Sequence, residues 1–226
     1  MLHKRVVKVL YTIFSYILLE LSSYLNVSSI VGSRRLFFSA INCTGPLIGR
    51  FNGLGAFILV LLRRCFFSTN TVSFVLFNPL LYHIPTLIAS TYWYSSSRFV
   101  RLGLPIILMG LFIMHPIGHQ AFVYSLFWLI PMFIHLLRYQ TPFTEALGTT
   151  FLAHGVGSVL QLYWAPMSTE YWIALLPLVV IERLLFASGM TLVYYGADWC
   201  IKMFSIYEYK AIELPRLPQV FNRLKA

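Results

Sequence analysis

Ionisable side chains interrupt several apolar segments of this chain, and they are the residues whose types suit chemistry. Placing an ionisable group at the centre of a membrane helix costs about 2.5–3.5 kcal/mol on insertion scales. Such a group is retained where it binds a ligand, carries a proton or forms a structural ion pair. The candidates for contact with a bound substrate are Arg50, His115, His119, Glu145, His154, Glu182 and Arg183.

The adjacent residues Glu182 and Arg183 are the sharpest signal, because both lie far from either end of the apolar segment 172–195. Neighbouring residues on a helix point about 100° apart, so these two need not pair with each other. Glu182 is expected to meet Arg50 or a histidine, and Arg183 to meet Glu145. Two interpretations follow, a substrate or proton site and a structural ion pair.

The histidines at 115 and 119 form the densest polar stretch. Two histidines four residues apart on a helix share a face and can ligate a metal. Pro116 and Gly118 lie between His115 and His119, which makes a regular helix doubtful, and no Cys, Asp or Glu is close in sequence. The stretch therefore indicates a polar cavity lining or hydrogen-bonded packing, and we assign no metal and no cofactor.

Arg50, Glu145 and His154 are the remaining candidates, and each lies within an apolar segment. Arg50 lies in the glycine-rich stretch 46–53, where it either binds an anion together with freed backbone amides or reaches an interface. Glu145 and His154 are nine residues apart on the segment 143–163, so they fall on opposite faces of a helix. The small residues after His154 favour the close approach of a neighbouring helix.

The composition requires lipid as the solvent. Of the 226 residues 58% are hydrophobic and 11% charged, with a mean hydropathy of +0.75. Soluble domains are about 45–50% apolar and about 25% charged. The segments 104–114 and 173–181 are continuously apolar, whereas a membrane barrel needs alternating strands. An all-α, polytopic transmembrane helical bundle is therefore predicted.

The bundle is predicted to contain six helices, or seven if its first segment also spans. Its domain covers 1–200, and 201–226 forms a basic cytoplasmic tail with no continuous helix across its prolines. The second segment is expected to be kinked or partly unwound near Gly45-Pro46. The apolar segments are 6–25, 36–62, 72–93, 102–115, 121–137, 143–163 and 172–195.

The basic residues predict the orientation. The connections 115–120 and 165–171 contain no Lys or Arg and are the natural outside loops, whereas Arg98, Arg101 and Arg138 fall inside. Six spans with both termini cytoplasmic fit best, with 6–25 interfacial or re-entrant and with Arg63-Arg64 left outside, against the rule. The net charge of +10 sits at segment ends, so nucleic acid is rejected as a partner and the plasma (inner) membrane is favoured.

The architecture resembles the substrate-binding S components of energy-coupling-factor (ECF) vitamin transporters. The stretch 42–49 (Asn-Cys-Thr-Gly-Pro-Leu-Ile-Gly) is similar to their early helices, whereas the small-residue coupling motif of their first helix is absent from 6–25. The resemblance implies a small-molecule substrate, and a transporter scaffold and ATPase subunits as partners. A small-solute transporter, or the substrate-binding subunit of one, is therefore the first functional hypothesis.

Two other hypotheses stay open. A membrane assembly or scaffold protein would use the same polar residues only for packing. An intramembrane hydrolase is suggested by Phe151-Leu-Ala-His154, which resembles one histidine motif of the CAAX-type membrane proteases. The Glu-Glu pair of those proteases is absent, and Glu182-Arg183 follows the histidine rather than preceding it. No catalytic residue is assigned.

Overall fold

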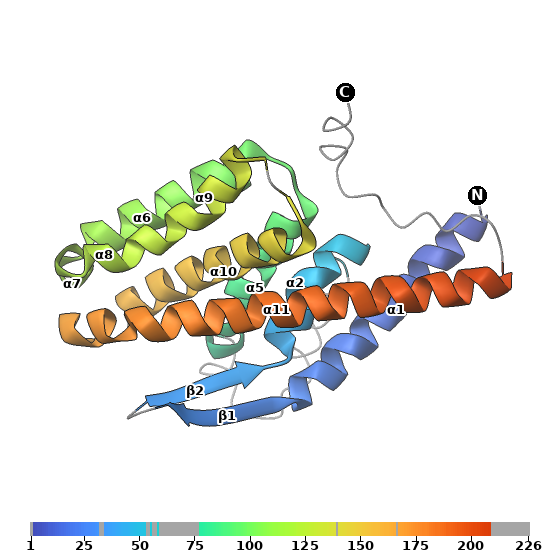
Figure 1. The fold of residues 1–226 in the computed structure, drawn as a ribbon, viewed down its shortest axis with the longest axis horizontal. Helices are drawn as coiled ribbons and strands as arrows, with labels where there is room; N and C mark the ends of the chain where they lie inside the picture. The colour runs from blue at the N-terminus through green and yellow to red at the C-terminus, as the bar shows by residue number, and fades with distance from the viewer. Residues whose placement is uncertain are drawn as a thin grey trace.

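The computed structural model describes residues 2–31, 34–52, 55, 58, 77–138, 140–165 and 167–208. These residues are predominantly helical (Figure 1), which confirms the helical class expected from composition. A π-helical turn, η1 (Phe99–Gly103), precedes α6, and a 3-10 turn, η2 (Leu126–Trp128), joins α8 to α9. The α-helices are α1 (Leu2–Tyr24), α2 (Ile41–Asn52), α5 (Phe77–Tyr94), α6 (Leu104–Met114), α7 (Pro116–Gln120), α8 (Phe122–Ser125), α9 (Leu129–Leu136), α10 (Pro142–Trp164) and α11 (Thr169–Glu208).

One β-hairpin departs from the helical prediction. Strands β1 (Asn26–Val31) and β2 (Arg34–Ser39) pair antiparallel, with Asn26 opposite Ser39. The expectation that the second apolar segment is helical from its start is therefore wrong, because 36–39 belong to β2 and α2 begins at Ile41. Valine, isoleucine and phenylalanine in these strands favour extended backbone.

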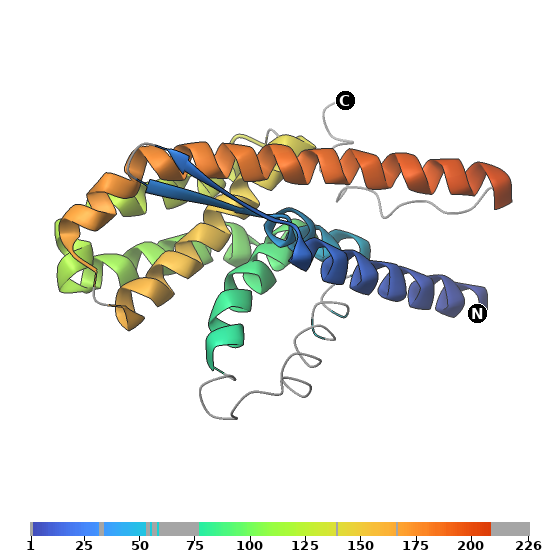
Figure 2. The ribbon, with the colours of Figure 1, turned by 90° about the horizontal axis from the view of Figure 1, so that it is seen from below.

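Two further elements differ in extent from the sequence prediction. A tilted, kinked or partly unwound helix was expected here, and α2 continues through Gly45 and Pro46 to Asn52 without unwinding. Helix α11 runs on to Glu208, so the first residues assigned to the basic tail are helical. In Figure 2 this end of α11 and the N-terminal part of α1 extend to the same side, beyond the other helices.

Helix α10 lies at the centre and contacts α5, α6, α9 and α11. Two of its glycines permit close approach. A Cβ atom on Gly148 would lie 2.6 Å from the hydroxyl of Tyr92, and one on Gly155 would lie 2.9 Å from the Trp128 indole nitrogen. Small residues let helix backbones approach each other in this way. The small residues of 154–158 were expected to permit close approach of a neighbouring element, and at Gly155 the Trp128 side chain packs in this way.

Aromatic packing closes the end of the bundle that carries α7. Phe112 of α6 is fully buried, and its ring lies 5.6 Å from that of Tyr124. Its edge-on contacts with Trp128 and Trp172 are both 5.3 Å between ring centroids. Such offset and edge-to-face pairs add stability beyond the area that they bury. Phe112 therefore joins α6 to α8, η2 and α11.

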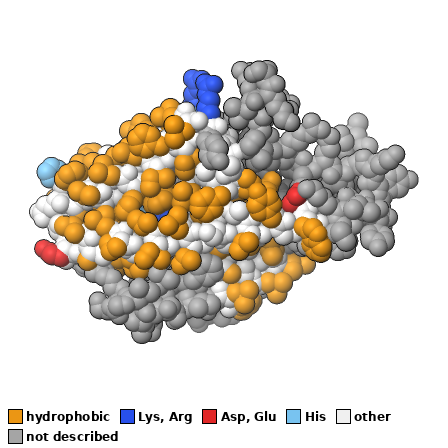
Figure 3. Space-filling view, in the orientation of Figure 1, with side chains coloured by type: hydrophobic (Ala, Val, Ile, Leu, Met, Phe, Trp, Pro, Cys, Tyr) orange, Lys and Arg blue, Asp and Glu red, His pale blue; other side chains and the backbone are white. Residues whose placement is uncertain are grey.

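The outer surface of the described helices is strongly apolar. In Figure 3 hydrophobic side chains spread over the face formed by α6, α9, α10 and α11. Large contiguous apolar patches are rare on soluble monomers and mark surfaces that meet a membrane or a partner. Exposed apolar residues on these and neighbouring helices include Ile106, Leu111, Phe133, Leu136, Ile173, Ile181, Leu185 and Leu192.

Among the described residues, α11 is the one helix both long and apolar enough to cross a membrane. Its segment Thr169–Trp199 has 31 residues, and the most apolar 18-residue window within it has a mean hydropathy of 1.9. Only 22% of that window is buried. A core helix of a soluble protein would be mostly buried. Phe99–Met114 and Phe122–Leu136 are apolar but shorter. The count of six spans stays a prediction.

The α2–α5 contact yields a prediction about stability. A Cβ atom on Gly49 would collide with the backbone carbonyl of Ser90, whereas one on Gly110 would meet nothing within 4 Å. Gly49→Ala should lower the free energy of unfolding by roughly 1–3 kcal/mol, because a backbone must shift. Gly110→Ala, the matched control, should be neutral or stabilising, because alanine favours helix by about 1 kcal/mol. Unfolding in detergent measures both, and equal responses would contradict the packing described.

Candidate functional site

A cavity of about 540 Å³ lies among α2, α5, α8, α10 and α11. Three of the substrate-contact candidates, His154, Glu182 and Arg183, line it together. The cavity lies where the second, sixth and seventh apolar segments meet. Its polar lining also includes Asn42, Thr86, Tyr124, Thr150, Ser158 and Gln161. Leu175, Val179 and Phe186 belong to its apolar lining.

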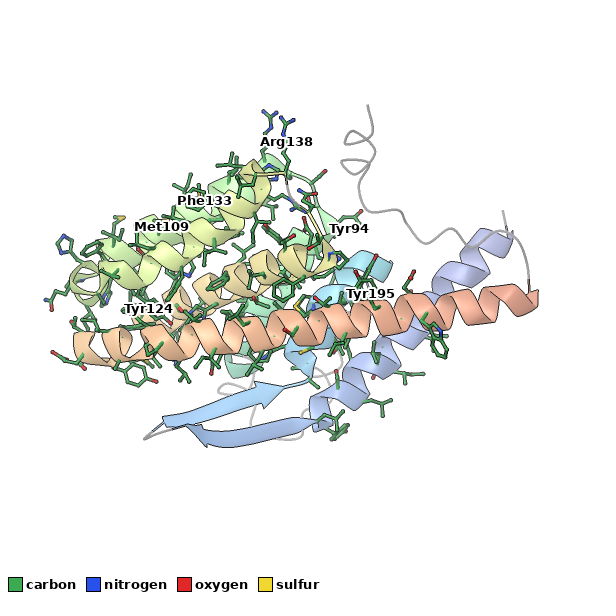
Figure 4. The ribbon with its side chains drawn as sticks, viewed as in Figure 1. Tyr94, Met109, Tyr124, Phe133, Arg138 and Tyr195 are labelled. Carbon is green, nitrogen blue, oxygen red and sulfur yellow. The ribbon has the colours of Figure 1, made fainter. Side chains whose placement is uncertain are left out.

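The first polar group of this pocket is a cluster of His154, Tyr124 and Ser158. The Tyr124 hydroxyl lies 2.7 Å from His154 Nε2 and 3.4 Å from the Ser158 hydroxyl. Ser158 Oγ lies 3.5 Å from His154 Nε2, one helical turn along α10. Figure 4 labels Tyr124 where α8 approaches α11. Sequence reasoning missed Tyr124, because nothing in its apolar surroundings marks it as a partner of a residue thirty positions away.

The second polar group is the pair Glu182 and Arg183. Arg183 Nη2 donates to Glu182 Oε2 at 3.1 Å, so the adjacent charges pair with each other. The expected contacts of Arg183 with Glu145 and of Glu182 with a histidine are absent among the described residues. The prediction for Arg183 was wrong, because long side chains bridge the 100° between neighbouring positions on a helix. The other expected partner of Glu182, Arg50, has its side chain outside the described part of the structure.

Arg183 is incompletely satisfied. Its Nη1 donates to the Thr150 carbonyl at 3.5 Å, a long hydrogen bond, and its Nε is buried without a hydrogen-bond partner. Its guanidinium carbon lies 4.9 Å from the centre of the Phe186 ring. A buried polar group without a partner is costly. Arg183 therefore keeps donor capacity beside the pocket.

Glu145 lies outside the pocket and forms a different ion pair. Arg101 donates to both of its carboxylate oxygens, at 2.8 and 3.0 Å. Arg101 also donates to the carbonyls of Ser95 and Tyr92, and its guanidinium lies 4.6 Å from the Tyr92 ring centre. Arg101 and Glu145 are 2% and 4% exposed. These contacts are typical of a structural ion pair. Arg101, Glu145 and the two carbonyls that accept from Arg101 are called the clasp below.

Through Arg101, the clasp fixes the start of α10 against η1 and the end of α5. Thr141 caps α10: its hydroxyl accepts from the Thr144 amide, while Thr144 Oγ1 accepts from the Thr141 amide. Glu145 then lies in the first turn, where the helix dipole favours a carboxylate. The sequence interpretation treated Arg101 as a cytoplasmic loop charge like Arg98, and the structure buries only Arg101.

The remaining candidates lie elsewhere. His115 caps the short helix α7, accepting from the Ile117 amide at 3.3 Å, and its ring packs edge-on against Tyr163 at 5.1 Å. His119 is exposed, and neither histidine lines the pocket. Arg50 belongs to α2, but its side chain lies outside the part of the structure that is described. Within the described ranges no three His, Cys, Asp or Glu residues gather where they could hold a metal ion.

Comparisons with protein-family models, with curated proteins and with solved structures found nothing that matches this chain. The function must therefore be argued from the pocket and from the surface around it.

The clasp yields a second prediction. Arg101→Met should destabilise the protein by about 3–5 kcal/mol, because it leaves Glu145 buried and unpaired. The double variant Arg101→Met with Glu145→Leu should recover much of this loss, because no charge then remains uncompensated. Arg98→Gln is the control and should change little, since Arg98 is exposed. Chemical unfolding in detergent measures all three, and a double variant no better than the single one would refute the clasp.

Proposed function

We propose that this chain is a polytopic membrane protein that binds a small solute in the pocket among α2, α5, α10 and α11, as a transporter or as its substrate-binding subunit. One observation carries the proposal. Three ionisable side chains distant in sequence from a helix end, His154, Glu182 and Arg183, line one cavity instead of being scattered through the fold.

The size and lining of the cavity support a small ligand. Pockets for small molecules are commonly about 300–1,000 Å³, mostly apolar, with a few polar groups that fix orientation. The cavity of about 540 Å³ falls in this range. Its two polar groups come from different elements, Tyr124 with His154 and Ser158, and Glu182 with Arg183. A ligand of vitamin or amino-acid size would reach both.

The surface of α1 supports a lipid environment. On the described part of this helix Val9, Ile13 and Ile17 are exposed, whereas Ser15 and Ser22 are buried. Ser22 accepts a hydrogen bond from Thr44 of α2 at 2.7 Å. Apolar groups outside and hydrogen-bonded hydroxyls inside are typical of helices packed in a bilayer.

The orientation of the pocket supports uptake from outside. Exposed Arg98 and Arg138 lie at the end of the bundle where α5 and α9 finish, and Arg138 points away from it (Figure 4). The opposite end contains α7 and the α10–α11 connection, which are joined by a Thr169–Gln120 hydrogen bond of 2.9 Å and contain no Lys or Arg. Under the positive-inside rule this end faces outward.

The exposed residues of the pocket belong to that outward end. Gln161 and Trp164 lie in the last turns of α10, and Tyr171 lies in the first turn of α11. All three line the cavity and are exposed. The charged pair lies three turns farther along α11, so a solute entering from outside meets aromatic rings first and charges last.

The alternatives differ in what they predict for the polar residues. A scaffold protein needs them only for packing, so their neutral replacement would change stability alone. A hydrolase needs an activated nucleophile, and Ser158 lies 3.5 Å from a histidine nitrogen that is held more closely by Tyr124 at 2.7 Å. Coupling to a transporter scaffold and ATPase subunits rests on the architectural resemblance and would appear as co-purifying partners.

Mass spectrometry of the natively purified protein tests the proposal. A small molecule should co-purify with the wild type and be lost from His154→Ala and Glu182→Gln, because both residues line the pocket. Arg98→Gln, far from the pocket, should retain it. Thermal unfolding of each variant separates lost binding from lost folding. A ligand-free wild type, with variants that change stability alone, would support the scaffold alternative instead.

Cysteine labelling tests the orientation. In a background with Cys43, Cys65 and Cys200 replaced, His119→Cys and Arg138→Cys place one thiol at each end of the bundle. Both positions are exposed. A membrane-impermeant maleimide should label His119→Cys in intact cells and Arg138→Cys only after permeabilisation, as the positive-inside rule requires. The reverse pattern would place the mouth of the pocket in the cytoplasm.

A further inference from the structure

We infer that the pocket selects a planar solute of zero net charge that presents a hydrogen-bond donor to Glu182 beside an acceptor for Arg183. An amide edge on an aromatic or heteroaromatic ring has this chemistry. The inference rests on the proposed function, since it names the class of solute that the same pocket would take.

Within the described structure, Glu182 and Arg183 have hydrogen-bonding positions that no protein group uses. Glu182 and Arg183 are joined by one hydrogen bond, from Nη2 to Oε2 at 3.1 Å. A guanidinium has five N–H donors, and a carboxylate has about four acceptor positions. Among the described residues, the one other hydrogen bond of Arg183 runs from Nη1 to the Thr150 carbonyl at 3.5 Å. Among the described residues no hydrogen bond reaches the second oxygen of Glu182.

The two buried arginines of this chain differ in how fully they are hydrogen-bonded. Arg101 shows how this chain satisfies an arginine that serves structure alone, with both oxygens of Glu145 and two backbone carbonyls around it. Arg183 has one carboxylate oxygen, one distant carbonyl and a buried Nε without a partner. Arg183 therefore has fewer acceptors than Arg101, and a ligand acceptor that meets its terminal Nη atoms would add hydrogen bonds of the kind that Arg101 already makes within the protein.

The formal charges of the lining residues limit the net charge of a ligand. Arg183 and Glu182 side chains are 12% and 19% exposed and cancel each other in formal charge. His154 contacts the hydroxyls of Tyr124 and Ser158 rather than a carboxylate. A ligand with net charge would add an uncompensated charge beside a largely buried ion pair, which is unfavourable. A neutral donor–acceptor edge contacts both side chains and leaves the balance unchanged.

The aromatic residues of the pocket indicate the shape of the solute. The Arg183 guanidinium lies over the Phe186 ring, and Tyr124 of α8 also lines the cavity. Trp164 and Tyr171 line the outward end. Aromatic side chains bind planar rings by stacking and edge contacts. The walls therefore favour a flat ring that carries its polar edge toward the charged pair.

A charge series of three isosteric probes tests the inference. Benzoate, benzamide and benzamidine share one ring and one trigonal substituent, with net charges of −1, 0 and +1. Each probe is added at equal concentration to the purified protein in detergent, and the shift in Tm is measured. Benzamide should raise the wild-type Tm by about 3 °C or more near saturation, and the two charged probes should not.

Single-charge variants should invert this preference. Glu182→Gln leaves a net positive pocket, so benzoate should become the best of the three probes, by about tenfold or more in apparent Kd. Arg183→Gln leaves a net negative pocket and should favour benzamidine. The double variant Glu182→Gln with Arg183→Gln is neutral again and should return to benzamide. Arg98→Gln, an exposed residue away from the pocket, should behave as the wild type.

The outcomes separate this inference from the proposed function. The charge-balance inference is overturned if the wild type, the two single variants and the double variant all prefer the same probe. It is also overturned if neither single variant responds to any probe. If a charged metabolite then co-purifies with the wild type and is lost from His154→Ala, the pocket still binds a solute and the proposed function stands. If nothing co-purifies and no probe binds, both fail.

Discussion

Close approach to α10 is the constraint on which the described structure depends. Gly148 and Gly155 leave no room for a side chain, because Tyr92 and Trp128 occupy that space. This contact brings α5 and η2 onto one helix, and α11 covers another part of it. Dispersion and short-range hydrogen bonds need such proximity, and in lipid they replace the hydrophobic drive between helices. A larger residue at either glycine would separate the elements that surround the pocket.

The two arginine–glutamate pairs differ in how completely they are hydrogen-bonded and therefore in what they can do. Arg101 and Glu145 join the start of α10 to the residues after α5, and almost every donor of Arg101 is used. The pair on α11 is joined by one hydrogen bond and lines a cavity. Breaking a saturated buried pair costs stability. An unsaturated pair instead offers donors and acceptors to a ligand, at some cost in its absence.

The cavity and the surface are both compatible with the membrane arrangement proposed above. Apolar side chains cover the outside of α1, α6, α9 and α11, while hydroxyls and charges are turned inward. The basic residues Arg98 and Arg138 mark one end, and the exposed pocket residues Gln161 and Tyr171 belong to the other. We therefore propose one direction of entry, past aromatic residues toward the charged pair. Each of these features is local, and each is what we expect of helices packed in lipid, a solvent that binds no polar group.

The sequence by itself determined the helical class, the positions of most helices and the residues worth suspicion, because composition and apolar run length act locally. It placed α10 and the start of α11 within a few residues, and it singled out His154, Glu182 and Arg183. It failed at the β-hairpin of 26–39, where a short apolar run fits helix or strand equally. Only the tertiary structure decided the partners: Glu145 with Arg101, and His154 with Tyr124. Those contacts join positions 44 and 30 residues apart, and helix periodicity carries no information about which neighbour packs against which face.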